Sequence, residues 1–296
     1  MLAAATRLAI TGTHRSGTTL LGRLIAADRG SARIFEPFNR DFGIEGVDRW
    51  YANADGADHR WDDLLDRFLR GEEGRFRTTS SLFKQWAYWL KPSSNQRVYH
   101  RAVRVPPNRL ILKDPFLALA SRQLIERYGF KVIYTIKHPV AFYRSLVRVG
   151  WHNIIPLDDL VAQGALDPAA RAAAQTPAAE AGLLWNLVNA HAVEVRAAHP
   201  LSVSFCLHED FCHNPIDETR RVAADLGIPF TPAIQDAVER LTSGTVVSPP
   251  ASKIHELVRN AQALPDLWRG EINAEDERAL RELCEPLYDE IYRRLW

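Results

Sequence analysis

The sequence has few cysteines and almost no net charge, and each shortage excludes a class of protein. Three cysteines in 296 residues are too few, and odd in number, for a disulfide framework, which favours a reducing compartment. Lysine and arginine total 37 against 36 acidic residues, so the overall charge indicates neither a nucleic-acid partner nor an anionic membrane. Any basic binding site must therefore be local.

Long hydrophobic runs are also absent. No apolar run approaches the roughly 20 residues of a membrane span, and Met1 to Thr6 contains no hydrophobic segment of signal-peptide length. We therefore expect no membrane span and a cytoplasmic location. A hydrophobic content of 46% suffices for a packed interior, and 296 residues lie near the upper size for one core. The economical expectation is one domain over residues 1–296.

A strand, a glycine-bounded loop and a helix are predicted near the N-terminus. Residues 8–11 form a short apolar run of strand type, and leucine and isoleucine recur at helical spacing over residues 20–25. Gly12 and Gly17 bound the loop between them and permit a close backbone approach. Because the first turn of a helix leaves N–H groups without intrahelical acceptors, this arrangement predicts an anion site.

The side chains of this loop also suit a phosphate. Arg15 adds a planar cationic fork, and Thr18 and Thr19 add hydroxyl donors. The spacing from Gly12 to Gly17 matches a Walker A loop, but Thr18 stands where that loop has its lysine, which disfavours an ordinary ATP or GTP hydrolase. The alternative is a glycine turn that only caps a helix. The candidate ligand-binding residues of the loop are Thr13, His14, Arg15, Ser16, Gly17, Thr18 and Thr19.

The run Arg15 to Leu20 resembles the 5′-phosphosulfate-binding loop of sulfotransferases that use 3′-phosphoadenosine 5′-phosphosulfate (PAPS). The resemblance implies an α/β fold of the P-loop NTPase type, with three layers and a central parallel sheet flanked by helices. It also implies PAPS as the sulfonate donor, adenosine 3′,5′-bisphosphate (PAP) as the product, and no metal.

A glutamate follows the second predicted strand, residues 31–35. Ligand sites in parallel α/β sheets lie at such strand ends. Glu36 stands 21 residues after Arg15, which resembles tyrosylprotein sulfotransferases, where a glutamate at that offset is the catalytic base. The pair Glu36-Pro37 also resembles carbohydrate 6-O-sulfotransferases. The alternative is a surface glutamate before a proline turn.

A third predicted strand, residues 109–112, ends at Lys113 and is followed by a helical segment from Leu117 to Tyr128. Sulfotransferases have a lysine at the corresponding strand end, near the transferred sulfonate. Some members use a histidine two residues later as the base, but this chain has Pro115 there, which favours Glu36 as the base. The resemblance thus implies catalytic roles for Glu36, Arg15 and Lys113.

The clearest predicted strand, residues 131–136, precedes a second cofactor motif. The family pattern is Arg-Asp-Pro with a serine eight positions after the arginine, and this pair binds the 3′-phosphate. Ser145 fits the serine, Lys137 replaces the arginine, and His138 replaces the aspartate. Since lysine is a point charge without a bidentate fork, we expect weaker or less selective 3′-phosphate binding. The alternative is a lysine that ends a core strand and meets solvent.

Two further segments match the family more loosely. Residues 201–206 alternate as a strand and lead to Glu209-Asp210, which resembles an acidic motif of the family with His208 in the place of a tyrosine. The basic Lys253 and Arg259 precede Trp268-Arg269 as a nucleotide-covering loop does in sulfotransferases, although a solvated charged face fits equally well.

A metal site is disfavoured. Cys206, His208, Cys212 and His213 cluster in sequence, but strand alternation separates the ligands and no second Cys/His pair follows. The resemblance offers the better account of this segment.

The expected activity is transfer of a sulfonate to a hydroxyl or amine of a small-molecule or carbohydrate acceptor, and residues 44–104 are the expected acceptor-binding insert. Two alternatives stay open. A nucleotide or small-molecule kinase shares the strand-loop-helix but needs Mg²⁺ and a lysine that the loop lacks. A non-catalytic nucleotide-binding module needs the loop but not Glu36 or Lys113.

Overall fold

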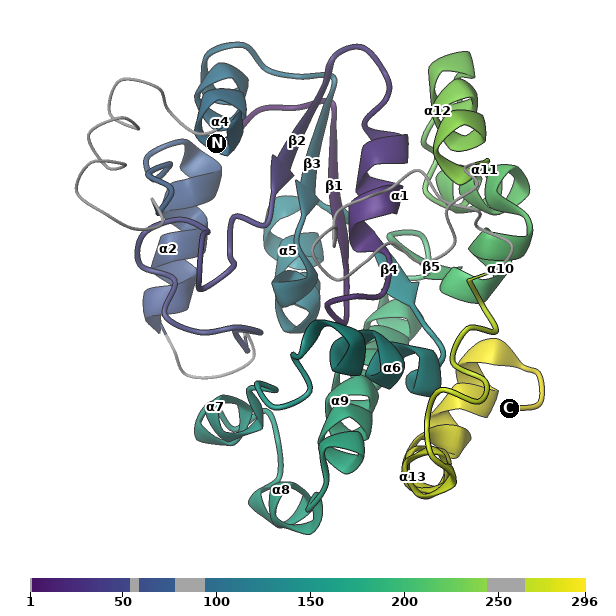
Figure 1. The fold of residues 1–296 in the computed structure, drawn as a ribbon. Helices are drawn as coiled ribbons and strands as arrows, with labels where there is room; N and C mark the ends of the chain where they lie inside the picture. The colour runs from purple at the N-terminus through teal and green to yellow at the C-terminus, as the bar shows by residue number, and fades with distance from the viewer. Residues whose placement is uncertain (1, 54–58, 78–93, 244–263) are drawn as a thin grey trace, which may run out of the picture.

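The computed structural model describes residues 2–53, 59–77, 94–243 and 264–296. Within these residues the centre is a five-stranded sheet with the order β2-β3-β1-β4-β5 (Figure 1), and every neighbouring pair is parallel. The predicted α/β fold with a central parallel sheet is therefore confirmed. The strands are β1 (Thr6–Gly12), β2 (Ser31–Phe35), β3 (Arg109–Lys113), β4 (Lys131–Ile136) and β5 (Val203–Leu207).

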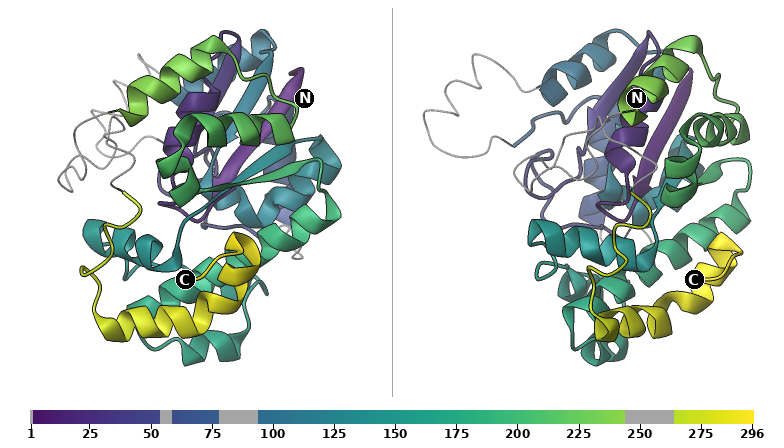
Figure 2. Two further views of the ribbon diagram at one scale, coloured as in Figure 1. Left: turned by 90° about the vertical axis from the view of Figure 1, so that its right-hand side faces the viewer. Right: turned by 45° about the vertical axis from the view of Figure 1, so that its right-hand side comes forward.

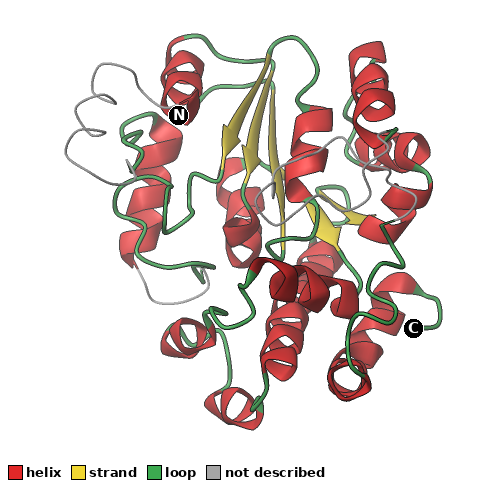
Figure 3. Ribbon diagram, in the orientation of Figure 1, coloured by secondary structure: helices red, strands yellow, loops and turns green. Residues whose placement is uncertain are grey.

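Helices make up most of the remaining described chain (Figure 3). Several begin with a proline, whose fixed φ and missing N–H suit the first turn. The helices are α1 (Thr18–Ile25), α2 (His59–Arg70), α4 (Ser94–Arg104), the 3₁₀ helix η1 (Pro115–Ala120), α5 (Ser121–Tyr128), α6 (Pro139–Val149), α7 (Leu157–Ala162), α8 (Pro168–Ala173), α9 (Pro177–Ala198), α10 (His208–His213), α11 (Pro215–Asp225), α12 (Pro232–Thr242) and α13 (Ala274–Tyr292).

Most residues of β1, β3, β4 and β5 are buried, whereas the edge strand β2 is mostly half-buried. Alternating residues of the sheet enter two separate cores. Leu8 and Ile10 of β1 pack in a core with α1, α11 and α12. Ala9 of the same strand belongs to the other core, together with residues of α5 and α9. Figures 1 and 2 show these two groups of helices on opposite sides of the sheet. The arrangement is the three-layer fold expected of parallel sheets.

The helix predicted from Leu117 to Tyr128 is two elements. Asp114 accepts a hydrogen bond from the Phe116 N–H and thereby starts η1, and α5 follows from Ser121. The predicted helical segment is confirmed, and its division into a 3₁₀ part and an α part has no clear sequence signal.

No helix in the described ranges has both the length and the apolar composition needed to cross a membrane.

Candidate functional site

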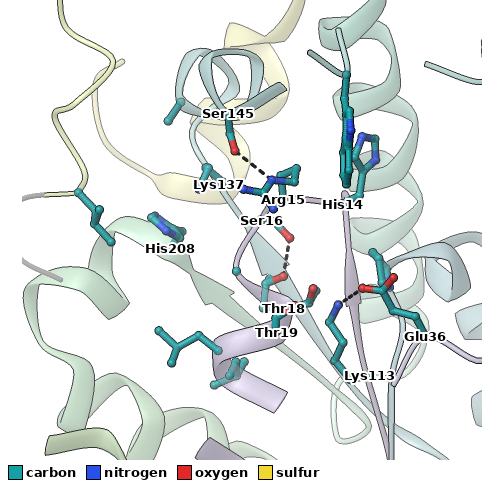
Figure 4. Close-up of a pocket in the computed structure, with 18 of the residues that line it drawn as sticks. His14, Arg15, Ser16, Thr18, Thr19, Glu36, Lys113, Lys137, Ser145 and His208 are labelled. Carbon is teal, nitrogen blue, oxygen red and sulfur yellow. Dashed lines mark hydrogen bonds and ion pairs between the residues drawn. The ribbon is translucent and has the colours of Figure 1, made fainter. Parts of the chain in front are cut away.

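One cavity opens at the carboxyl edge of the sheet, and residues at the ends of all five strands line it. These residues are Ser16 after β1, Glu36 after β2, Lys113 of β3, Lys137 after β4 and His208 after β5. The cavity volume is about 390 Å³, within the range of about 300–1,000 Å³ typical of ligand sites. Figure 4 shows His208 on one side of the loop that follows β1, and Glu36 with Lys113 on the other.

The loop between β1 and α1 depends on its two glycines and a buried serine. Gly12 has a φ of +133°, and a Cβ there would lie 2.3 Å from the carbonyl oxygen of Thr135. Gly17, with a φ of +107°, directly precedes α1. The Ser16 hydroxyl donates to the carbonyl oxygen of Thr13 at 2.6 Å and so stabilises the loop. The Thr13 hydroxyl oxygen is buried without a partner in the described chain.

The first two turns of α1 combine an anion site with the support of a lysine. Thr18 and Thr19 line the cavity in the first turn, where N–H groups lack intrahelical acceptors and the helix dipole is positive. One turn later, a Cβ at Gly22 would lie 2.9 Å from the Cγ of Lys113. Gly22 thus makes room for the Lys113 side chain beside the helix.

Arg15 joins the first predicted cofactor motif to the second. Its backbone has a φ of +69°, an uncommon conformation for a non-glycine residue. Its Nε donates to the Ser145 hydroxyl at 3.3 Å, and its guanidinium lies 5.7 Å from the ring centroid of Trp151. Lys137 lines the same part of the cavity (Figure 4). The structure therefore brings Arg15, Lys137 and Ser145 together, although Arg15 and Ser145 are 130 residues apart.

His138 takes over the capping position at the start of α6. Its Nδ1 accepts a hydrogen bond from the Val140 N–H at 3.3 Å, as a side-chain oxygen does at most helix starts. Burial lowers the pKa of His138 to about 4, so the imidazole is neutral at physiological pH. The histidine thus caps the helix as the expected aspartate would, but it does not supply the negative charge of an aspartate.

Glu209 connects the start of α6 with the end of α13 and with His208. Its carboxylate accepts from the His138 N–H at 3.0 Å and from the Tyr292 hydroxyl at 2.8 Å, and lies 3.6 Å from Nδ1 of His208. Burial alone would raise the pKa of Glu209, but His208 and these hydrogen bonds outweigh it and lower the pKa to about 2. The acidic motif of the sequence therefore fixes the end of β4, next to Lys137.

Lys113 and Glu36 form a buried ion pair at the other side of the cavity (Figure 4). Their side chains are 2% and 12% exposed. The second carboxylate oxygen of Glu36 accepts from the Asn39 amide at 2.8 Å. Burial lowers the pKa of Lys113, and the Glu36 carboxylate opposes that effect. Two of the three predicted catalytic residues are thus in direct contact.

Asp114 supports the turn that carries Glu36. Its carboxylate accepts from the backbone N–H of Phe38 at 2.6 Å and of Phe116 at 3.0 Å. Burial, and then the nearby Glu36 carboxylate, raise the pKa of Asp114 to about 8. Asp114 therefore connects the residues after β2 to the residues after β3.

His14 lies among aromatic rings on the side of the cavity opposite His208. Its Nδ1 lies 2.7 Å from the Tyr51 hydroxyl, which also accepts from the His14 backbone N–H at 2.8 Å. Burial, and then the charge of Arg15, lower the pKa of His14 to about 3. His14 is therefore uncharged at neutral pH, and an anion in the cavity gains no charge pairing from it.

Aromatic side chains form the cavity wall beside Glu36. Trp50 and Phe116 stack with centroids 5.3 Å apart and planes within 9°, and both line the cavity with Trp151. Such surfaces bind flat or apolar molecules well. Of the predicted acceptor insert, the structure describes residues 44–53, 59–77 and 94–104.

Sequence reasoning missed two arginines and an asparagine. Arg144 and Arg148 of α6 line the cavity together with Ser145, and Arg144 makes a bidentate contact with Glu271 at 2.6 and 2.8 Å. Arg148 stands three residues after Ser145, and this helical spacing was a usable signal for it. Asn39 had none, because its role depends on a contact with Glu36 that only the folded turn creates.

Lys253 and Arg259 lie outside the described residues. In the part of the chain that the structure describes, no three His, Cys, Asp or Glu side chains are grouped so that they could hold a metal ion.

Comparisons with known proteins give one family match and several similar solved structures. A family model described as "Sulfotransferase family" matches residues 8–232. The sulfotransferase domain of the Synechococcus PCC 7002 olefin synthase is 18% identical with a TM-score of 0.52, covering 98% of this chain and 95% of that one. A sulfotransferase domain from the curacin biosynthetic pathway (16% identity, TM-score 0.48, 95% and 98% covered) and retinol dehydratase in a complex with retinol and PAP (15%, 0.48, 97% and 82%) also match. No curated protein matches. The olefin synthase domain shows a shared fold.

Proposed function

This chain belongs to the sulfotransferase family, and from that premise we propose that it transfers the sulfonate of PAPS to a hydroxyl or amine of a small-molecule or carbohydrate acceptor. One observation carries the proposal. The residues suited to a doubly phosphorylated nucleotide and the residues suited to proton and sulfonate transfer line a single cavity.

The nucleotide side of the cavity suits a polyanion. The start of α1 and Arg15 are the proposed ligands of the 5′-phosphosulfate, and Lys137 with Ser145 those of the 3′-phosphate; that all of them line this cavity supports the proposal. Lys253 and Arg259 stay proposed ligands of the nucleotide. Adenosine 3′,5′-bisphosphate is the expected product.

The reaction is an in-line displacement at sulfur. The acceptor O–H bond breaks and its proton goes to Glu36, while a new bond forms between the acceptor oxygen and sulfur. The bond from sulfur to the phosphate oxygen breaks, and its electron pair remains on the phosphate. Arg15, Lys113 and the first N–H groups of α1 stabilise this developing charge. The step needs no metal as written.

Acceptor binding is proposed for the wall formed by Trp50, Phe116 and Trp151, with further contacts from residues 44–104. Since the exposed edges of these mostly buried rings line the same cavity as Glu36, a sugar ring or another small molecule with an exposed hydroxyl fits this place. We further propose that residues 1–296 act as one domain.

Calorimetric titration without added metal tests the donor. PAP, ADP and ATP are compared, and we expect clear preference for PAP. Equal or better binding of ATP would favour a kinase instead. Labelled sulfonate transfer to a panel of sugars and phenols then tests turnover, which a non-catalytic module lacks. Glu36→Gln should lower turnover at least a hundredfold with little change in PAP affinity, and equal losses in both would contradict the base assignment.

A further inference from the structure

The ion pair between Lys113 and Glu36 occupies the groups that the proposed reaction needs. One Glu36 oxygen, Oε1, accepts from Nζ of Lys113, and the other, Oε2, accepts from Nδ2 of Asn39 at 2.8 Å. The ammonium also lies 4.5 Å from the ring centroid of Phe35. In this state each carboxylate oxygen already accepts a hydrogen bond, and Oε1 faces the Lys113 ammonium in the place where an acceptor hydroxyl would have to approach.

The orientation of Asn39 is fixed by its other contacts. Its Oδ1 accepts from the Asp41 N–H at 2.9 Å and from the Trp50 indole N–H at 3.3 Å. Both partners can only donate, so the amide nitrogen must face Glu36. Asn39 therefore holds Oε2 with a donor, and it does so whether or not Lys113 is present.

The Lys113 ammonium cannot pair equally well with the Glu36 carboxylate and with a second anion. It is buried, as is most of Glu36, and breaking a buried ion pair leaves an uncompensated charge unless another anion replaces the lost partner. A sulfonate at the start of α1 is such an anion, since Lys113 lines the same cavity as Thr18 and Thr19 of the first turn of α1 (Figure 4).

We propose that donor binding activates the base by ion-pair exchange. The sulfonate of the donor takes over the Lys113 ammonium, Oε1 of Glu36 becomes available to the acceptor hydroxyl, and Asn39 is the positioning residue that keeps the carboxylate in place. The inference rests on the proposed function. Lys113 keeps its proton throughout, and Oε1 receives the acceptor proton as the bond between sulfur and the acceptor oxygen forms. The acceptor is thus deprotonated only when a sulfonate is present.

Binding measurements test this exchange without knowledge of the acceptor. PAPS and PAP differ by the sulfonate alone, so the ratio of their affinities isolates the contact made by that group. In Glu36→Gln, which can keep the contact with Asn39, the sulfonate no longer competes with a carboxylate for the Lys113 ammonium. We expect PAPS to bind at least tenfold tighter relative to PAP than in the wild type. In Lys113→Met the ratio should fall below the wild-type value.

Asn39→Ala supplies a second variant and Asn189→Ala its matched control. Asn189 is another buried asparagine, on α9, and its amide donates to the Trp185 carbonyl oxygen at 2.8 Å. Without Asn39 the carboxylate can turn away from Lys113, so the PAPS to PAP ratio should rise by about threefold. The Asn189→Ala control should lose stability but keep the wild-type ratio, which separates a positioning role from a structural one.

The outcomes are distinct. An unchanged ratio in Glu36→Gln, with normal PAP binding, overturns the exchange. Equal rises in Asn39→Ala and Asn189→Ala overturn the role of Asn39. If wild-type protein binds neither PAPS nor PAP, the proposed function itself fails, and the exchange fails with it.

Discussion

Replacing Glu209 by glutamine should lower the free energy of unfolding by about 3 kcal/mol at neutral pH and by much less in acid. The magnitude follows from the pKa of this carboxyl, which is 4.5 in the unfolded chain and about 2 in the folded protein. At about 1.4 kcal/mol for each pH unit, that difference amounts to about 3 kcal/mol. Breaking a buried charged network by removing one partner typically costs a similar amount, about 3–5 kcal/mol.

The pH dependence has a definite sign. Above pH 4.5 the Glu209 carboxyl is ionised in both states, so the stabilisation is complete. As the pH falls from about 4.5 towards 2, the unfolded chain binds the proton first and the stabilisation is lost. Glutamine does not titrate, so the difference between wild type and variant should shrink over this interval.

Urea denaturation followed by circular dichroism at pH 7, 5, 4 and 3 measures the difference. Glu282→Gln, on an exposed position of α13, is the control and should change the free energy of unfolding by less than about 0.5 kcal/mol. A Glu209→Gln deficit of equal size at pH 7 and pH 3 would show that the carboxylate charge contributes nothing, which would refute the reasoning.

Two further changes test the cofactor motifs. Lys137→Arg should tighten PAP binding by about fivefold to tenfold, because a guanidinium binds phosphate bidentately. Calorimetry should show no change in the affinity for adenosine 5′-monophosphate, which lacks the 3′-phosphate. An equal gain for both nucleotides would mean that residue 137 does not contact the 3′-phosphate. Gly12→Ala should destabilise the protein by about 3 kcal/mol or more in urea, since its Cβ would lie 2.3 Å from the Thr135 carbonyl oxygen. Gly150→Ala is the control with positive φ and no atom within 4 Å, and it should cost only about 1 kcal/mol.

Much of the sheet could be predicted from the sequence because its strands are short, apolar and bounded by polar residues. The predicted strands at 31–35 and 131–136 match β2 and β4 to the residue. The strand predicted at 201–206 is β5, Val203–Leu207. Its shift by one or two residues reflects hydrogen bonding to β4, which starts the pairing at Val203. Register is a property of the neighbouring strand as well as of the segment itself.

The contacts within the candidate site could be predicted less well. The Lys113–Glu36 pair follows from β2 lying next to β3 with Phe35 opposite Lys113, so it becomes predictable only when the strand order is known. The contact of Tyr51 with His14 needs a positive φ of 54° at Tyr51. Sequence alone gives no reason to expect that conformation in a residue other than glycine.

The two departures from the family pattern at the start of α6 differ in kind. His138 caps the helix through Nδ1 and also stacks on Trp268, with ring centroids 4.9 Å apart and planes within 16°. An aspartate could form the cap but offers no ring for Trp268. Because burial keeps the His138 imidazole neutral, this substitution changes packing with the C-terminal part of the chain and adds no charge beside Lys137. Any loss of 3′-phosphate affinity should therefore come from residue 137, which is why Lys137→Arg alone should recover it.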